Sequence, residues 1–137
     1  MSTLRTNALE GVDAKNSITI VAGAGNITTT NVQEGLAKAS ITFNGTSTVA
    51  TRQSFNIASL VDDSSGNYSV NSTNGMANSE YAIAGVSGNY DASNPGNKCT
   101  SANPNTSTDI SIEITSSSDG SSTDTGYIAM LFYGDLA

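Results

Sequence analysis

The sequence predicts an all-β protein, an antiparallel β-sandwich (jelly-roll-like), with an extended N-terminal arm and one short helix. Isoleucine, valine, threonine and tyrosine recur at period two in short segments, which is the spacing of strands with one buried face. Asn44-Gly45 and Ser65-Gly66 separate such segments. Asn-Gly between alternating runs favours a hairpin, because both turn positions need positive φ.

The composition excludes several classes of partner. The chain has 137 residues, enough for one domain with a modest core. It carries a net charge of −7, five Lys and Arg residues and no His. A nucleic-acid-binding surface needs a basic stripe that displaces counterions, and the sequence has none. Since no apolar run is long enough for a transmembrane helix, we expect neither a nucleic-acid partner nor membrane insertion.

The residue types also argue against catalysis. Without His a Ser/His/Asp triad cannot be built, and zinc sites lack ligands. Cys99 is alone and cannot form a disulfide within the chain. Asp62-Asp63 suits a turn better than a glycosidase acid/base pair, and the loop carboxylates Asp119 and Asp124 lack EF-hand spacing for calcium. We expect a protein that is not an enzyme and has no cofactor or metal.

The first residues lack the pattern of a regular element. Residues 1–17 hold Leu4, Leu9 and Val12 among polar residues, at a spacing that fits neither a helix nor a long strand. Such a segment is either an arm that buries its apolar side chains on another protein or a frayed terminus. Residues 17–22 alternate isoleucine with threonine and predict the first strand.

A two-turn helix is predicted from Asn31. Asn31 and Glu34 are placed as a capping box, and Val32 and Leu36 share one face. A helix this short is marginal alone. It would be stable if three copies met around an axis, or if it packed on its own domain as a linker helix.

Residues 39–71 predict a β-meander, because three apolar runs are separated by the two glycine turns. Within it, residues 49–60 predict two strands or one bent strand, with Arg52 near the middle. Arg52 is either a solvated strand residue, which is the favoured interpretation, or the partner of Asp62, Asp63 or a neighbouring subunit. Residues 80–86 predict a further strand.

Two loops are predicted in the second half. Residues 87–108 contain both prolines, and a loop of this length in a compact domain is usually functional or mobile. Tyr90 in this loop is either a receptor contact or a residue that pins the loop to the core. The candidate receptor-contact residues are Tyr90, Asp91, Asn94 and Lys98. Residues 116–126 predict the second loop.

Two strands flank this second loop. Residues 109–115 place Ile110, Ile112 and Ile114 on one face, which predicts a strand with one buried and one wet face. Residues 127–133 are almost continuously apolar, which predicts a central strand buried on both faces or a strand at a subunit interface.

Parts of the sequence resemble a known family. The segments Phe43–Thr46, Ser54–Ile57 and Gly66–Asn71, with Asp62-Asp63 between the last two, resemble a module that recurs in tail-fibre-like virion proteins of tailed phages, many of them marine. Ser2–Arg5 and Thr29–Lys38 are also similar to that family, so the resemblance covers most of residues 2–86. It implies a non-enzymatic virion protein that assembles as a homotrimer and attaches to the virion through its N-terminus.

On this basis we expect a virion protein, assembled in the host bacterial cytoplasm, with an attachment arm at residues 1–35 and a β-sandwich domain at 36–137. The arm would dock on other virion proteins of the tail or capsid through Leu4, Arg5, Leu9 and Val12. The trimer interface would include Val32, Leu36, Tyr127, Leu131 and Tyr133. As a fibre or fibre tip it would contact a host surface glycan or protein.

Two alternatives remain open at this point. A capsid decoration or head-fibre protein would use the same arm, and its loops would recognise nothing. A free carbohydrate-binding β-module would bind a glycan as a monomer, although the absence of Trp counts against a sugar platform.

Overall fold

The computed structural model describes residues 19–21, 29–31, 36–90 and 96–137. The chain divides into two compact units, residues 1–36 and 37–137. In the first unit, β1 (Thr19–Val21) pairs antiparallel with β2 (Thr29–Asn31). β1 lies within the strand predicted at residues 17–22.

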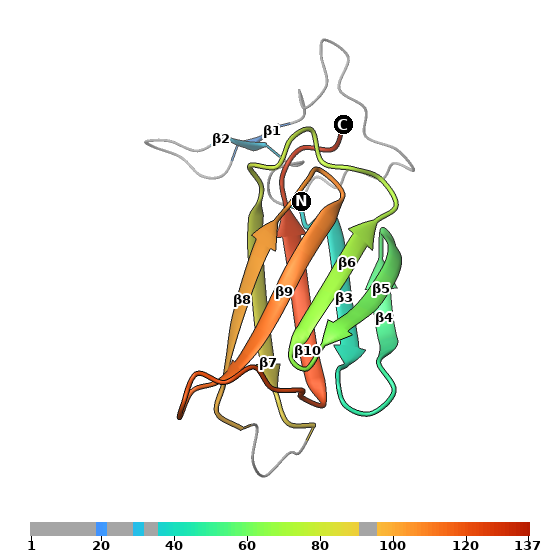
Figure 1. The fold of residues 1–137 in the computed structure, drawn as a ribbon. Helices are drawn as coiled ribbons and strands as arrows, with labels where there is room; N and C mark the ends of the chain where they lie inside the picture. Colours follow the sequence, from blue (N-terminus) through green and yellow to red (C-terminus); the bar gives the residue numbers. More distant parts are fainter. Residues whose placement is uncertain (1–18, 22–28, 32–35, 91–95) are drawn as a thin grey trace. The chain divides into compact units, whose positions relative to one another are not determined.

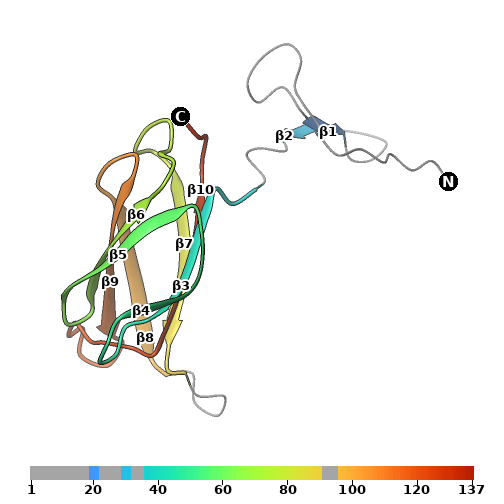
Figure 2. The same cartoon turned by 90° about the vertical axis from the view of Figure 1, so that its right-hand side faces the viewer.

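The second unit, as far as the structure describes it, is formed by eight strands in two antiparallel sheets of four. The strand order is β4-β3-β10-β7 in one sheet and β5-β6-β9-β8 in the other. Figures 1 and 2 show the two sheets lying face to face. The strands are β3 (Ala39–Asn44), β4 (Ala50–Phe55), β5 (Ile57–Ser64), β6 (Asn67–Ser72), β7 (Ala82–Gly88), β8 (Lys98–Pro104), β9 (Asp109–Ser116) and β10 (Tyr127–Tyr133). The predicted all-β class is confirmed.

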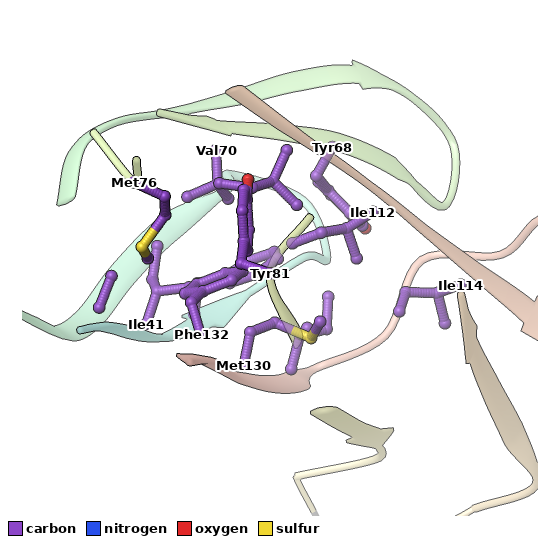
Figure 3. Close-up of a cluster of buried hydrophobic side chains, with 13 residues drawn as sticks. Ile41, Tyr68, Val70, Met76, Tyr81, Ile112, Ile114, Met130 and Phe132 are labelled. Carbon is purple, nitrogen blue, oxygen red and sulfur yellow. The ribbon is translucent and has the colours of Figure 1, made fainter. Parts of the chain in front are cut away.

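The core lies between the sheets and is filled mainly from their four inner strands (Figure 3). Alternate residues of β3, β6, β9 and β10 are buried, which is the period-two pattern of strands with one buried face. The rings of Phe43 and Tyr68 meet edge to face across the two layers, with centroids 5.1 Å apart. The most buried large side chains are Tyr68, Phe43, Phe132, Ile41, Ile110, Ile112, Ile114, Ile128, Met130 and Val70.

The predicted meander is wrong as a single-sheet motif, because the chain changes sheets at Asn56. β4 pairs with β3, whereas β5 pairs with β6 in the opposite sheet. Asn56 lies between β4 and β5 and has a φ of 56°, in the left-handed region that asparagine tolerates better than most residues. Residues 39–71 therefore form two hairpins in two sheets, and residues 49–60 contain two strands, one of the two predicted alternatives.

The two predicted glycine turns have different outcomes. Gly66 has a φ of 72° and forms the tight β5–β6 turn, as predicted from Ser65-Gly66. Asn44-Gly45 is not a two-residue hairpin turn, because residues 45–49 all lie between β3 and β4 and the positive φ, 59°, falls on Ser47. Gly45 instead allows a close approach of Tyr68, as described below.

The long loop predicted at residues 87–108 is wrong in its second half, where the structure places β8. β8 is an edge strand that pairs with β9 alone, from Lys98 opposite Ser116 to Pro104 opposite Ile110. Its sequence, KCTSANP, lacks apolar alternation. An edge strand can form without this pattern, since its register is imposed by the neighbouring strand.

β9 and the predicted strand at residues 109–115 agree, with Ile110, Ile112 and Ile114 all buried. β10 is central in its sheet, between β3 and β7, as predicted. Burial on both faces is wrong within this chain, because Leu131 is 41% exposed while its neighbours Met130 and Phe132 are buried. The interface alternative for this strand remains a prediction.

The short helix predicted from Asn31 is not confirmed. Asn31 ends β2, and residues 36–38 are irregular up to the start of β3 at Ala39. Residues 32–35 and the arm residues 1–18 lie outside the described residues.

Candidate functional site

The outer face of the sheet β4-β3-β10-β7 is exposed and mainly apolar, and we call it the apolar face. Its residues alternate with the buried ones and sit opposite each other in the sheet register, as for Leu131 with Ala84 and Ser40. Phe55 and Val86 are each 61% exposed and Leu131 is 41% exposed. The apolar face consists of Ser40, Thr42, Gln53, Phe55, Ala82, Ala84, Val86, Tyr127, Ala129, Leu131 and Tyr133.

Carboxylates are distributed unequally between the two sheets. The strands β3, β4, β7 and β10 contain no Asp or Glu. The opposite sheet contains Asp62, Asp63, Asp109 and Glu113 in its strands. In a chain with a net charge of −7, the apolar face is therefore the side on which another acidic surface can approach with the least repulsion.

The apolar face is hollowed near its middle. A cavity of about 440 Å³ lies over β3, β7 and β10, and Leu131, Val86 and Thr42 lie around it. Ala84 and Ala129 lie on its β7–β10 side, where their short side chains leave the space open, and the polar side chains of Ser40 and Gln53 also line it. The apolar face thus combines a shallow hollow with large apolar side chains around it.

One end of the apolar face carries a cation–aromatic cluster. Cζ of Arg52 lies 4.0 Å from the centroid of the Tyr90 ring. The ring of Tyr90 also stacks with Tyr127 at a centroid distance of 6.1 Å. Tyr90 is 73% exposed, yet both contacts join it to strands of the apolar face. This geometry favours the interpretation that Tyr90 fixes its loop to the sheet.

The outer face of the opposite sheet, the polar face, has a different character. A trough of about 430 Å³ lies over β6, β8 and β9. Its polar lining side chains are Asp63, Asn67, Ser101, Asn103, Ser111 and Glu113. Five of these six side chains already make hydrogen bonds within the chain. Asp63 accepts one from Ser69 at 2.6 Å and Glu113 accepts one from Ser122 at 2.9 Å. Asn67 donates to the Ser65 carbonyl oxygen, Asn103 donates to Asn105, and Ser111 accepts from Asn105.

A buried tyrosine joins three connections at one end of the sheets. The hydroxyl of Tyr68 donates to the Gly45 carbonyl oxygen at 2.9 Å and lies 3.2 Å from Asp124 Oδ1. The same Asp124 oxygen accepts a hydrogen bond from the Gly66 amide at 2.7 Å. Burial raises the pKa of Tyr68, and the negative charge of Asp124 raises it further. Tyr68 is therefore a neutral hydrogen-bond donor rather than an acid or base.

The loop after β9 closes this end of the domain (Figure 1). The Thr125 carbonyl oxygen accepts a hydrogen bond from the Gly45 amide at 2.9 Å, and its hydroxyl donates to the Gly88 carbonyl oxygen. The Asn97 carbonyl oxygen accepts a bond from the Ser117 amide at 3.0 Å. The β9–β10 loop thus contacts both ends of the β7–β8 connection.

The structure places three of the predicted trimer-interface residues on one face. Tyr127, Leu131 and Tyr133, predicted for the trimer interface, share the apolar face. Leu36 belongs to the other unit and is 58% exposed, and Val32 lies outside the described residues. The predicted attachment residues Leu4, Arg5, Leu9 and Val12 also lie outside them.

The candidate receptor-contact residues do not form one exposed loop. Tyr90 contacts Arg52 and Tyr127, and Lys98 begins β8 with its Nζ 3.4 Å from Thr123 Oγ1. Asp91 and Asn94 lie outside the described residues.

Phe55 and Val86 are apolar-face residues that the sequence did not single out for assembly. Their strand register is the signal that assigns them, since each lies opposite an outward-facing residue of the neighbouring strand.

The acidic loops were the candidates for a metal. Asp119 accepts hydrogen bonds from the Ser121 amide and hydroxyl, which lower the pKa of its carboxyl and occupy Oδ1. Among the described residues, no group of three or more His, Cys, Asp or Glu side chains is placed to hold a metal ion. In the same part of the chain, no helix is long and apolar enough to span a membrane.

Comparison with known protein families, with curated proteins and with solved structures finds no match to this chain.

Proposed function

We propose that the protein is a non-enzymatic structural protein of a tailed-phage virion, a trimeric fibre or fibre tip with a jelly-roll-like sandwich domain. The observation that carries this proposal is the apolar face, which exposes Phe55, Val86 and Leu131 on strands that contain no carboxylate. Large apolar surfaces on soluble domains usually mark contacts with other proteins. The sequence resemblance supplies the virion context and the trimeric state.

The position of the loops supports a role in host contact. The β7–β8 connection and the β9–β10 loop are joined at one end of the domain through the Asn97–Ser117 and Thr125–Gly88 hydrogen bonds. A fibre tip presents such a cluster of connections to a host glycan or protein, while rigid strands hold it in place. The proposed arm at residues 1–35 would bind the particle.

Incorporation into particles tests the virion role. Deletion of residues 1–17 should remove the protein from purified phage particles, while the purified variant keeps its β-sheet circular dichroism. Replacing residues 89–97 by a Gly/Ser linker should lower adsorption to the host if the loop end contacts a receptor. Unchanged adsorption with normal incorporation would favour the alternative, a capsid decoration or head-fibre protein.

The trough on the polar face favours a second candidate, a free carbohydrate-binding β-module. Its lining offers hydroxyl, carboxamide and carboxylate groups in a concave site, which suits a polar ligand such as a neutral glycan. The aromatic residue in its lining is Tyr68, whose ring is buried and whose hydroxyl is engaged with Gly45. Glycan-array binding by a monomer that does not associate with particles would support this candidate over the virion protein.

A further inference from the structure

We propose that a second copy of this chain docks on the apolar face, with Phe55 of one copy seated in the hollow bordered by Thr42, Val86 and Leu131 of the other. This inference rests on the proposed homotypic assembly and deepens it, since it assigns the contact to a specific side chain and a specific hollow.

Phe55 is an exposed aromatic side chain beside a backbone corner that is held by hydrogen bonds. It is the last residue of the edge strand β4, is 61% exposed and is not part of the lining of the hollow in its own chain. The next residue, Asn56, donates to the Lys38 carbonyl oxygen at 3.0 Å and accepts from the Asn74 amide at 2.9 Å. These bonds hold the backbone corner next to Phe55, so little backbone freedom is lost when its ring is buried.

The hollow has the properties of an apolar receptor site. Its volume of about 440 Å³ is of the size that admits a bulky side chain, and Ala84 and Ala129 lie on its β7–β10 side. Leu131 and Val86 stand beside these alanines in the sheet register, so a ring that enters would contact aliphatic groups on several sides. Burial of an aromatic side chain in such a site removes much apolar surface from water.

Charge argues that the occupant is another copy. The chain is acidic, and most acidic proteins of this charge would repel each other, but the strands of the apolar face contain no Asp or Glu. The charged side chain on these strands, Arg52, is already stacked on Tyr90. Because one chain carries both the exposed Phe55 side chain and the hollow, copies can associate head to tail, and three such contacts form a closed trimer when successive copies are related by a rotation of about 120°.

The size of the face sets the expected strength. Four strands of about seven residues cover on the order of 400 Å² of flat sheet, roughly half of what one partner buries in a standard interface. In a closed trimer each chain uses its Phe55 edge for one neighbour and its hollow for the other neighbour. We therefore expect the assembly to dissociate on dilution.

The test uses the full chain and measures solution mass by light scattering over a range of concentrations. Phe55→Asp should lower the mass at high concentration from about three chains to one. Val61→Asp is the matched control, because Val61 is also exposed (45%) on an edge strand but lies in β5 of the opposite sheet. The control should keep the wild-type mass. Circular dichroism establishes that each variant is folded. If Phe55→Asp does not fold, Phe55→Ala is measured in its place.

A mixing experiment separates this contact from general loss of apolar surface. Ala84→Glu places a charge in the hollow and leaves Phe55 intact, so alone it should also be a monomer. An equimolar mixture of Phe55→Asp and Ala84→Glu should form a species of two chains, because one intact ring meets one intact hollow. A monomeric wild type, an unchanged mass for Phe55→Asp, or equal dissociation of Val61→Asp would overturn the proposal.

Solution mass and incorporation into particles, measured together on the wild-type protein, distinguish the docking from the virion role. Particles that still incorporate a monomeric wild-type protein would contradict the docking and leave the virion role standing. A protein that forms the expected trimer but is never incorporated into particles would support the docking and contradict the virion role.

Discussion

The hydroxyl oxygen of Tyr68 lies 3.2 Å from Asp124 Oδ1, although the two residues are 56 positions apart in the chain. Asp124 also accepts the Gly66 amide, and Tyr68 donates to the Gly45 carbonyl oxygen. A buried side chain of β6 thereby holds the β3–β4 and β9–β10 connections together. We expect this relationship to be measurable as stability.

Replacement of Tyr68 by Phe should destabilise the domain by about 1–2 kcal/mol, because it leaves the Gly45 carbonyl oxygen without its donor. Urea unfolding followed by circular dichroism measures the change. Tyr133→Phe is the control, since the Tyr133 hydroxyl makes no hydrogen bond within the described part of the chain. Equal stability of Tyr68→Phe and wild type would show that the bond contributes nothing net.

Stability should fall as the pH rises above about 10. Burial raises the pKa of Tyr68 above its ordinary value of 10.0, and the Asp124 charge adds to this effect. Burial also raises the pKa of Tyr81, with a smaller contribution from Asp109. Below pH 10 both phenols are protonated in the folded and unfolded chains. Above it the unfolded chain loses the protons first, so each tyrosine removes about 1.4 kcal/mol per pH unit until its folded pKa is reached.

Urea midpoints at several pH values from about 9 to about 11 measure this slope. Tyr68→Phe should reduce the slope without abolishing it, because burial also raises the pKa of Tyr81. A slope that is the same in the variant would mean that Tyr68 does not keep its proton in the folded state.

Gly45→Ala should cost about 1–3 kcal/mol by overpacking, although the φ of Gly45 is not positive. A Cβ at this position would lie 2.3 Å from the Tyr68 hydroxyl oxygen, which is fixed by its own hydrogen bond. Gly120→Ala is a useful comparison, because nothing lies within 4 Å there and its φ of 71° alone carries a strain of about 1 kcal/mol. Thermal unfolding of both variants tests whether Gly45→Ala loses more stability than Gly120→Ala. A larger loss for Gly120→Ala would contradict the close approach.

Arg52 and Tyr90 should show a coupling of about 0.5–1 kcal/mol in a double-mutant cycle. The guanidinium carbon lies 4.0 Å from the ring centroid, which is within the range of a cation–π contact. Arg52→Ala, Tyr90→Ala and the double variant are compared by urea unfolding. Additive losses would mean that the two side chains lie close without a net interaction.

The sequence was sufficient for elements whose burial leaves a periodic signal. The alternation of Ile110, Ile112 and Ile114 predicts β9, and the apolar run at residues 127–133 predicts β10 as a central strand. Both strands contribute fully buried side chains, so the pattern and the core coincide.

The remaining features depend on distant neighbours. β8 has no apolar alternation and takes its register from β9. Gly45 carries a turn-like sequence, but Tyr68, 23 residues away, determines why glycine is needed. The apolar face could be assigned only in part, because outward positions of β4 and β7 are fixed by register with β3 and β10 rather than by their own sequences.

The central place of β10 has a consequence for synthesis. β10 is the last strand along the described chain, yet it lies between β3 and β7 and pairs with both. While the ribosome is making residues 39–126, the β3–β4 hairpin and β7 have no partner between them, and the inner side chains of this layer remain wet. Folding of this sheet must therefore wait until residues 127–133 have emerged from the ribosome. The apolar face is complete only after that step, so association through it follows synthesis of β10.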